Sequence, residues 1–563
     1  MKTVAVLGGG VGGLSAAHEL AERGFKVTVY EMHDAFGGKA RSMDKPCSGK
    51  DDRPNLPGEH GFRFFPNFYT HILDTMKRIE YDGKTVADNL VPTTQMLLAQ
   101  GQKGKELPAP MVPPSSVDDL IAALTFMREF VFGLGIPMHE FRDYAMGLLT
   151  LLVSCDARRK GQWERMSWWD FMVRGRDRTE AFEKFLADGM TRCLVAARGR
   201  EMSALTGGMI TLRLMLDNTD VPTDRVLNGP TSEVWIDPWV EYLRSKNVDL
   251  LGGHTVGGIH CDGRKITGVT VVGPRGDQRV TADYYIAAMP KEKLELLISP
   301  QMCTADPDLA KVSKLQTRWM NGAMFYLDTD KPLINGHIVF IDSEWSLTAI
   351  SQKQFWKVDL TERGDGRVEG ILSVDISDWR TPGKNGKVAS ACTAAEIRAE
   401  VWKQMEDHIE DGSLDERNVV DFFLDPAISF PGPAGAMNAE PLLINTPGSW
   451  EDRPKAKTRI PNFFLAADFV QTDTDLATME AANEAARLAV NAILKAERSK
   501  ADPCWLRTFP EPRVLAPFRL MDRVLWRLGR KPPKPPVQVT PRGEVKPTGR
   551  IARTVAAGAR LGR

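Results

Sequence analysis

The chain has 563 residues, of which 42% are hydrophobic and 26% are charged. These values are typical of a folded globular protein and exclude a disordered, collagen-like or multi-span membrane chain, and the length predicts two to four structural units. Lys plus Arg and Asp plus Glu both number 73, so no overall basic field favours a nucleic-acid partner.

Cysteine and histidine usage excludes the common metal motifs. The seven cysteines and nine histidines show no metal-ligand spacing, so we expect no metal site. Scattered cysteines suit a reducing compartment, and no apolar run reaches the ~18 to 20 residues that a membrane span needs. We therefore expect a cytoplasmic protein, at the inner face of a membrane if its tail binds lipid. The sequence carries no signal for a particular oligomeric state.

The first 31 residues predict a dinucleotide-binding unit. A buried strand over 3–7 is followed by Gly8-Gly-Gly10-Val-Gly-Gly13, a helix to Arg23 and a second strand over 26–30. In a G-x-G-x-x-G turn of this kind the glycines permit the turn, the approach of a pyrophosphate and close helix packing, and the helix N-terminus faces the phosphates. An acid after the second strand accepts hydrogen bonds from ribose hydroxyls. The residues predicted to contact the dinucleotide are Gly8, Gly10, Val11, Gly12, Gly13 and Glu31.

A second glycine pair follows in Gly37-Gly-Lys-Ala-Arg41. It offers flexible backbone and two cations near the same diphosphate, which a nicotinamide-binding domain does not need. We therefore predict FAD rather than NAD as the cofactor, with Gly38, Lys39 and Arg41 among its ligands.

The segment 117–218 is predicted to be a helical insertion. Apolar spacing and capping residues indicate helices over 120–132, 168–173 and 179–196. The insertion contains Trp163, Trp168 and Trp169, which either line an apolar tunnel or pack in a core.

The rest of the chain predicts two sheets. Short runs over 266–272, 278–281 and 284–289 indicate a three-stranded meander. Strands over 324–327, 337–341, 347–351 and 370–376, with a helix over 394–408 before a later strand, indicate a second sheet with its own helix. A buried strand over 463–466 and a helix over 476–494 then return the chain to its first domain.

These elements predict an α/β fold in which a Rossmann-like FAD-binding domain of the two-dinucleotide type is joined to a discontinuous α+β substrate domain with a helical insertion. The FAD-binding domain is assigned to 1–70, 225–300 and 455–498, and the substrate domain to 71–224 and 301–454. Residues 499–563 form a tail.

The tail is basic and rich in proline. Residues 501–563 contain 14 basic and 4 acidic residues. A helix from Pro517 would place Phe518, Met521, Leu525 and Leu528 on one face and Arg519, Arg523, Arg527 and Arg530 on another. With Trp526, this pattern predicts an interfacial membrane anchor within 513–530, and a helix docked on its own protein or on a partner is the alternative. From Lys531 onward we expect extended or disordered chain.

Three blocks resemble the plant and cyanobacterial type of carotene desaturases in the flavin amine oxidase superfamily. The first is Gly37-Gly-Lys-Ala-Arg41 with Glu59-His-Gly61-Phe-Arg-Phe-Phe-Pro-Asn-Phe-Tyr69. The second runs from Gly229 to Pro290, and the third joins Phe463-Phe-Leu-Ala-Ala-Asp468 to Leu476–Ala485. Arg63 stands where that family has His, and Ala467 where it has Gly.

The resemblance implies further cofactor contacts. Gly61 and Phe62 would pass the flavin ring, Val256 would contact the adenine side by its backbone, and Asp468 would meet the ribityl and phosphate region. The helix start, with Met479, Glu480 and Ala481, would lie at the flavin ring. Because the loop from Glu59 runs beside that ring, His60 and Arg63 are the candidate catalytic residues, and the alternative is that both are ordinary hydrogen-bonded residues at a domain seam.

The predicted function is that of an FAD-dependent oxidoreductase, a desaturase or dehydrogenase that oxidises a hydrophobic small molecule, isoprenoid, carotenoid-like or lipid, by hydride transfer to flavin. Quinone or oxygen would reoxidise the flavin. One alternative is an amine or amino-acid oxidase that releases hydrogen peroxide. Another is a flavin-binding assembly protein without turnover.

Overall fold

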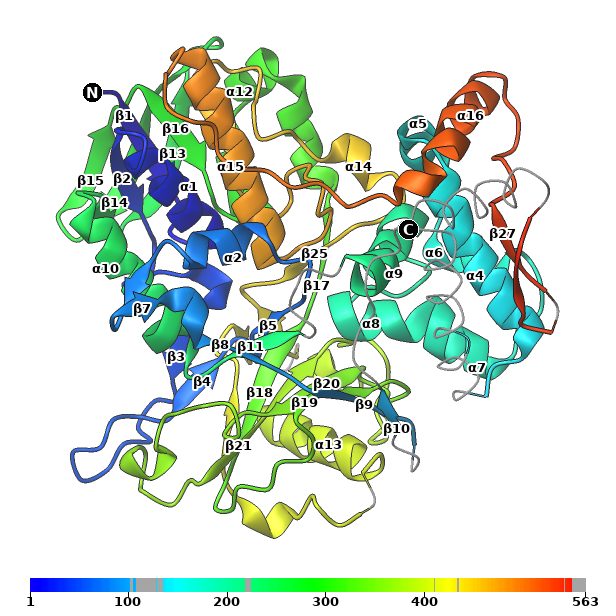
Figure 1. Cartoon of the computed structure of the whole chain (residues 1–563). Helices are drawn as coiled ribbons and strands as arrows, with labels where there is room; N and C mark the ends of the chain where they lie inside the picture. The colour runs from blue at the N-terminus through cyan, green and yellow to red at the C-terminus, as the bar shows by residue number, and fades with distance from the viewer. Residues whose placement is uncertain are drawn as a thin grey trace.

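The computed structural model describes residues 1–101, the backbone of 105–107, residue 128, and residues 135–217, 224–409, 411–432, 435–540 and 542–548. A parallel sheet with its helices, a mixed sheet and a helical lobe pack together around one cavity (Figure 1). The predicted α/β class is confirmed. The helix predicted over 120–132 lies outside the described residues, apart from Arg128.

The parallel sheet contains strands from both ends of the domain that the sequence predicts to bind FAD. Its order is β12 (Asp249–Leu251), β2 (Lys26–Tyr30), β1 (Thr3–Leu7), β16 (Tyr284–Ala287) and β26 (Phe463–Leu465). Strand pairing is parallel throughout. The three adjacent strands β1, β16 and β26 are formed mostly by buried apolar residues, whereas the edge strand β12 is partly exposed. Helices α1 (Val11–Ala21) and α15 (Met479–Ala496) pack side by side on the sheet (Figure 1).

Three predicted boundaries in this unit were wrong. Helix α1 begins at Val11 rather than at Gly13, and α15 begins at Met479 because Thr478 caps it by accepting a hydrogen bond from the Ala481 N–H. The meander consists of β13 (Thr255–Cys261), β14 (Ile266–Gly273) and β15 (Gly276–Val280). Residues 284–287 belong instead to the parallel sheet, where β16 is buried between β1 and β26.

The mixed sheet has seven strands: β10 (Lys105–Leu107), β9 (Gln95–Ala99), β19 (Gly336–Phe340), β20 (Leu347–Ser351), β21 (Gly370–Ile376), β18 (Asn321–Leu327) and β22 (Val419–Leu424). One face packs its apolar side chains against helix α13 (Ala394–Glu406), which confirms the predicted sheet with its own helix. Because side chains alternate along a strand, the opposite face holds His337, Thr348 and Asp375, and Thr348 lies directly across from Asp375.

The helical lobe confirms a helical segment after residue 135. It contains α4 (Met138–Val153), α5 (Asp156–Arg158), α6 (Trp168–Val173), α7 (Glu180–Phe182), α8 (Met190–Val195) and α9 (Ala204–Leu216). Two π-helical turns, over 159–163 and 183–189, join α5 to the chain that follows and α7 to α8. Trp163 and Trp168 pack in the core of this lobe, so core packing, not a tunnel, explains these two residues.

Smaller elements connect these units. They include β3 (Ser42–Asp44) paired with β4 (Pro57–Glu59), β5 (Phe64–Phe65), β8 (Leu90–Pro92) and β11 (Arg225–Leu227) in one sheet, β17 (Gln316–Arg318) paired with β25 (Leu442–Ile444), and the helices α2 (His71–Met76), α10 (Asp237–Ser245), α12 (Pro300–Ala305) and α14 (Ser449–Asp452). Within the described ranges, no helix is both long and apolar enough to cross a bilayer.

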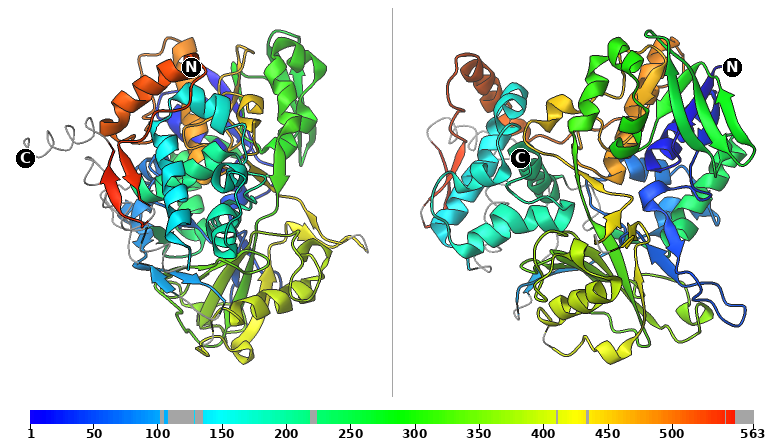
Figure 2. Two further views of the ribbon diagram at one scale, coloured as in Figure 1. Left: turned by 90° about the vertical axis from the view of Figure 1, so that its right-hand side faces the viewer. Right: turned by 180° about the vertical axis from the view of Figure 1, so that it is seen from behind.

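The tail is more ordered than predicted. Helix α16 (Ala516–Arg527) packs on α4 and α5, and a hairpin of β27 (Val537–Val539) and β28 (Val545–Pro547) packs on α4, all on the outside of the helical lobe (Figures 1 and 2). Val537 and Val539 are buried, so the extended segment predicted from Lys531 contains a folded hairpin. Residues 549–563 lie outside the described part.

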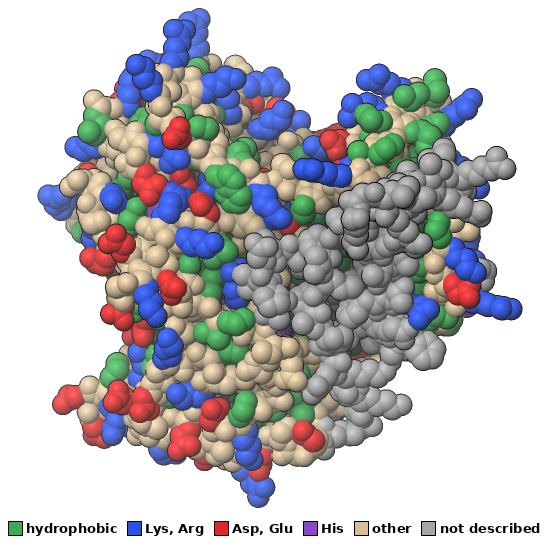
Figure 3. Space-filling model, viewed as in Figure 1, with side chains coloured by type: hydrophobic (Ala, Val, Ile, Leu, Met, Phe, Trp, Pro, Cys, Tyr) green, Lys and Arg blue, Asp and Glu red, His purple; other side chains and the backbone are tan. Residues whose placement is uncertain are grey.

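The two faces of α16 differ from the prediction. Its inner side holds Asp522, which is fully buried and pairs with Arg158 at 2.9 Å, and Trp526, which lies under the Arg158 guanidinium. Phe518 and Leu525 are half-buried. The outward apolar residues are Leu520, Met521, Val524 and Leu528. Figure 3 shows hydrophobic and basic side chains together over this helix.

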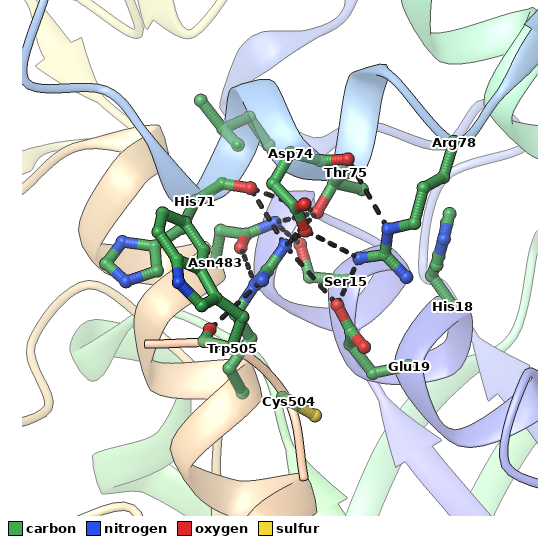
Figure 4. Close-up of polar contacts among 12 residues, drawn as sticks. Ser15, His18, Glu19, His71, Asp74, Thr75, Arg78, Asn483, Cys504 and Trp505 are labelled. Carbon is green, nitrogen blue, oxygen red and sulfur yellow. Dashed lines mark hydrogen bonds and ion pairs between the residues drawn. The ribbon is translucent and has the colours of Figure 1, made fainter. Parts of the chain in front are cut away.

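A buried arginine ties the two ends of the predicted FAD-binding domain together, and Figure 4 labels its partners Glu19, His71, Asp74, Asn483 and Trp505. Arg487, on α15, donates to Asp74 Oδ2 at 2.7 Å, to the His71 carbonyl at 2.9 Å and to Asn483 Oδ1 at 2.8 Å. It also donates to the Trp505 carbonyl and lies 3.4 Å from Glu19 Oε1 of α1. One guanidinium thus joins α1, α2, α15 and the start of the tail.

Replacing this arginine is expected to destabilise the fold strongly. Arg487→Leu leaves Glu19, which is 1% exposed, without one of its cationic partners, and removal of one member of a buried charge pair costs about 3–5 kcal/mol. Urea denaturation followed by circular dichroism measures the loss. Lys495→Met, an exposed position on the same helix, is the control and should change stability by less than ~0.5 kcal/mol. Equal stability of the two variants would contradict a structural role for Arg487.

Candidate functional site

One cavity of about 630 Å³ runs from the glycine loop of β1 and α1 to the space between the mixed sheet and the helical lobe. All three units contribute to its wall. The site residues predicted from sequence that line it are Gly8, Gly10, Val11, Gly12, Glu31, Gly38, Lys39, His60, Gly61, Phe62, Arg63, Val256, Asp468 and Met479. Gly13, Arg41, Glu480 and Ala481 do not line it.

The nucleotide end is built from backbone groups and one acid. No side chain caps α1 at Gly10, so the free N–H groups of its first turn and the positive end of its dipole meet the cavity. Glu31, 6% exposed at the end of β2, accepts hydrogen bonds from the Gly9 N–H at 2.7 Å and the His33 N–H at 3.0 Å. This pairing holds a carboxylate at the cavity wall beside a site suited to an anion.

The glycines serve different steric purposes. A Cβ on Gly12 would lie 2.0 Å from the Ala466 carbonyl oxygen, and one on Gly13 would lie 1.9 Å from the Gly8 carbonyl oxygen. Both therefore permit α1 to approach the sheet. Gly10 has an extended backbone, and a Cβ there would meet only Gly38, at 3.7 Å. Its missing side chain leaves space in the cavity rather than relieving backbone strain.

The two predicted cations are already paired. Lys39 Nζ lies 3.2 Å from Glu292 Oε1, whose pKa is raised by burial although Lys39 opposes the shift. Arg41 donates to the Gly38 carbonyl at 2.7 Å and lies 3.4 Å from Glu440. Lys39 reaches the cavity wall, whereas Arg41, also predicted at the diphosphate, does not line the cavity and braces the loop beside it.

The start of α15 contributes Thr478, Met479 and Ala482 to the wall. The Glu480 carboxylate turns the other way and accepts hydrogen bonds from the backbone N–H groups of Thr70, His71 and Ile72 at 2.8 to 2.9 Å. Burial alone would raise the pKa of Glu480, but its bonds to His71 and these amides hold it below its usual range. Glu480 therefore holds α2 against α15, and its carboxylate does not point into the cavity where the flavin ring was predicted.

The candidate catalytic residues lie in the loop between β4 and β5. His60 Nδ1 lies 2.6 Å from Asp425 Oδ2, and Arg63 donates to the Lys39 carbonyl at 2.8 Å. Glu59, fully buried beneath them, accepts hydrogen bonds from Ser42 Oγ and the Thr231 N–H, and burial raises its pKa against the opposing charge of Arg63. The structure thus brings both residues to the cavity wall within a charged, buried cluster.

Two titratable residues in the wall were missed by the sequence analysis. Asp375, on β21, lies against Gly61, where a Cβ would be 2.5 Å from its Oδ1. Burial raises the pKa of Asp375 to about 7, although Arg63 and the Phe62 N–H favour its charged form. His337, on β19, has its pKa lowered to about 4 by burial alone. Both could have been found in the sequence, because each is a polar residue within a mostly apolar strand.

One apolar part of the wall comes from the helical lobe. It contains Cys193, Leu194 and Val195 of α8, and Ile210 and Leu214 of α9. Burial raises the pKa of the Cys193 thiol to about 12, so this residue behaves as an apolar group. The opposite wall, with His337, Thr348 and Asp375, is polar, and the cavity therefore presents two chemically different sides.

The raised pKa of Asp375 predicts a pH-dependent stability. The folded state keeps this carboxyl protonated up to about pH 7, whereas an unfolded chain releases the proton near pH ~4, so wild-type stability falls relative to Asp375→Asn between these values. From pH ~4 to above pH ~7 the stability difference should change by up to ~4 kcal/mol in favour of the variant. Urea denaturation across this pH range measures it. Ser373→Ala, on the same strand and face, should show no such dependence, and a constant difference for Asp375→Asn would contradict the assignment.

Comparison with known proteins gives a consistent picture. The family model for flavin-containing amine oxidoreductases matches residues 11–494. The chain is 24% identical to 15-cis-phytoene desaturase of Synechococcus elongatus over 513 residues, covering 87% of this chain and 95% of that protein. It is 22% identical to zeta-carotene desaturase of a Synechocystis species over 516 residues, covering 87% and 97%.

Solved structures support the fold. Cyclohexylamine oxidase from Brevibacterium oxydans superposes with a TM-score of 0.58 at 16% identity, covering 88% of this chain and 100% of that chain. A putrescine oxidase superposes with a TM-score of 0.55 at 15% identity, covering 88% and 98%. Together with the glycine loop, the acid at β2 and the cavity, the match over most of its length shows that this chain belongs to the flavin-containing amine oxidoreductase family and is a flavin-dependent oxidoreductase.

Proposed function

We propose that this oxidoreductase uses FAD to oxidise a hydrophobic isoprenoid, carotenoid-like or lipid substrate, as a desaturase or dehydrogenase. The observation that carries the proposal is the single cavity that begins at the Gly8–Gly13 loop and continues into apolar walls from α8 and α9. A cofactor and a substrate would thus share one continuous space. The relatives named for phytoene and zeta-carotene match nearly the whole chain, which supports an isoprenoid substrate.

The cavity residues fit FAD in particular. Gly10, Gly37 and Gly38 expose backbone without side chains, as a pyrophosphate requires, and Glu31 is positioned for ribose hydroxyls. Asp468 and the N-terminus of α15 lie in the same wall, so a long cofactor of adenine, diphosphate and flavin parts has contacts from three chain segments. Bound there, FAD supplies a ring that accepts a hydride from a substrate C–H bond.

Residues around the inner end of the cavity would position the substrate and exclude water. The apolar side chains of α8 and α9 would hold the hydrocarbon chain, and the dipole of α15 would favour negative charge near Thr478 and Met479. His60 and Arg63 remain our candidates for contact with the reacting end. Within the described residues Arg63 Nε is buried and has no hydrogen-bond partner, so it is available to a polar group.

The proposal is tested by flavin reduction without oxygen. Purified protein loaded with FAD is mixed anaerobically with polyene isoprenoids, fatty acyl lipids and amines, and the visible flavin absorbance is followed. We expect bleaching by an isoprenoid or lipid, because the cavity wall beside the substrate space is largely apolar. Bleaching by amines alone would contradict the proposal and favour an amine oxidase. No bleaching by any compound would favour a flavin-binding protein without turnover.

The same preparation tests the cofactor site through Gly10→Val. A valine fits the extended backbone at Gly10 and has room in the protein, but it fills space that the diphosphate would take. We expect retained folding and an FAD affinity reduced by ~100-fold or more, equivalent to ~2.7 kcal/mol. Gly258→Val, on β13 with similar space and outside the cavity, is the matched control and should bind FAD normally.

We also propose that α16 binds an anionic lipid surface. Its outward residues Leu520, Met521, Val524 and Leu528 are 45% to 63% exposed. Exposed arginines flank this apolar stripe, namely Arg513, Arg523, Arg527 and Arg530. Asp522, on the other face of the helix, pairs with Arg158 and keeps this stripe facing outward. An outward apolar stripe bordered by arginines is typical of an interfacial helix on negatively charged headgroups.

Liposome flotation tests this surface. Wild-type protein should float with phosphatidylglycerol vesicles and less with phosphatidylcholine vesicles, because arginine attraction adds to apolar burial. The double variant Leu520→Glu and Val524→Glu should lose most flotation while Asp522 keeps the helix docked. Met437→Glu, an exposed apolar residue on β24 (Met437–Asn438), is the control. Equal flotation of the double variant and wild type would contradict a lipid-binding role for α16.

A further inference from the structure

The polar side of the cavity contains buried groups with unmet hydrogen-bonding capacity. His337 is 4% exposed, and neither of its ring nitrogens has a hydrogen-bond partner within the described residues. Asp375 is 7% exposed, and its Oδ1 likewise has none there. Both side chains line the cavity. Leaving such a group unsatisfied costs about 1–3 kcal/mol, so a bound group that satisfies it gains affinity.

The surroundings of His337 restrict what it can bind. The rings of Phe62 and Phe64 flank it, with centroids at 5.2 and 4.9 Å. Since burial lowers the pKa of His337 to about 4, the imidazole is neutral at physiological pH and offers one N–H donor and one nitrogen acceptor. A hydroxyl group, which both donates and accepts, complements that pair.

Asp375 and Thr348 extend this polar area. They lie directly opposite each other on β20 and β21, on the same sheet face as His337. Near neutral pH, a large fraction of the Asp375 carboxyl is protonated and can donate a hydrogen bond. A ligand carboxylate is less suitable, because Arg63, the nearby cation, is already shared by the buried acids Glu59 and Asp375.

We propose that His337, Thr348 and Asp375 form a subsite for a hydroxyl group on an otherwise apolar substrate. The inference rests on the proposed function only in taking this cavity as the substrate cavity. It adds that the substrate is an alcohol of the isoprenoid or lipid class rather than a bare hydrocarbon. His337 binds the hydroxyl, Thr348 and Asp375 extend the polar wall beside it, and the side chains of α8 and α9 hold the hydrocarbon chain.

Binding titrations under anaerobic conditions test the subsite without requiring turnover. FAD-loaded protein is titrated with geranylgeraniol, with the parent hydrocarbon that lacks the hydroxyl, and with geranylgeranoic acid, using tryptophan fluorescence and the flavin spectrum. Wild type should bind the alcohol ~10-fold or more tightly than the hydrocarbon, since a site built for a hydroxyl discriminates against ligands without one. His337→Phe should abolish that preference and leave hydrocarbon affinity within ~3-fold, because it keeps the ring volume.

His260→Phe is the matched control. His260 lies on β13, outside the cavity, with its ring nitrogen 2.7 Å from Thr270 Oγ1, so this variant should keep the preference for the alcohol. Equal wild-type affinity for alcohol and hydrocarbon, or tighter binding of the acid, would overturn the subsite. Loss of bound FAD from folded His337→Phe would overturn it too, by placing His337 against the cofactor. A preference for the alcohol, together with no flavin bleaching by any isoprenoid or lipid in the anaerobic screen, would keep the subsite and reject the proposed oxidation.

Discussion

The architecture depends on how closely α1 approaches the backbone of β1 and β26. Gly12 and Gly13 lie where any Cβ would overlap the carbonyls of Ala466 and Gly8, so the helix packs directly on the sheet. This contact joins the first residues of the chain to a strand more than 450 residues later, and Arg487 reinforces it. The cavity exists because these distant segments meet there, with the α1 N-terminus opening into it.

Burial controls the chemistry of the inner cavity. The mixed sheet directs one face to α13 and the other to the cavity, so the polar residues of three adjacent strands are withdrawn from water together. Withdrawal favours neutral forms, which is why Asp375 holds its proton more tightly and His337 holds it less tightly than in water. A neutral polar wall opposite an apolar wall is suited to an amphipathic ligand with little charge.

The tail shows how one buried charge can determine a surface. Asp522 faces inward to Arg158, and this pairing sets the rotation of α16 about its axis. As a consequence, Phe518 and Trp526 turn toward the lobe, and Leu520, Val524 and Leu528 turn to solvent with the arginines beside them. Helical periodicity predicted an amphipathic helix with Phe518, Met521, Leu525 and Leu528 on its apolar face, whereas the exposed apolar residues are Leu520, Met521, Val524 and Leu528, because the contact with Arg158 sets the rotation.

The sequence by itself determined the local elements and the cofactor class. Strand and glycine-turn patterns depend on neighbouring residues, so β1, α1, β2 and the acid Glu31 could be predicted, and the family blocks indicated flavin. Only the tertiary structure decided which side chains face the cavity. Glu480 and Arg41 turn away to partners distant in the chain, whereas Asp375 and His337 turn in from strands whose faces are set by sheet packing. Those orientations come from long-range contacts and burial, which a single sequence does not encode position by position.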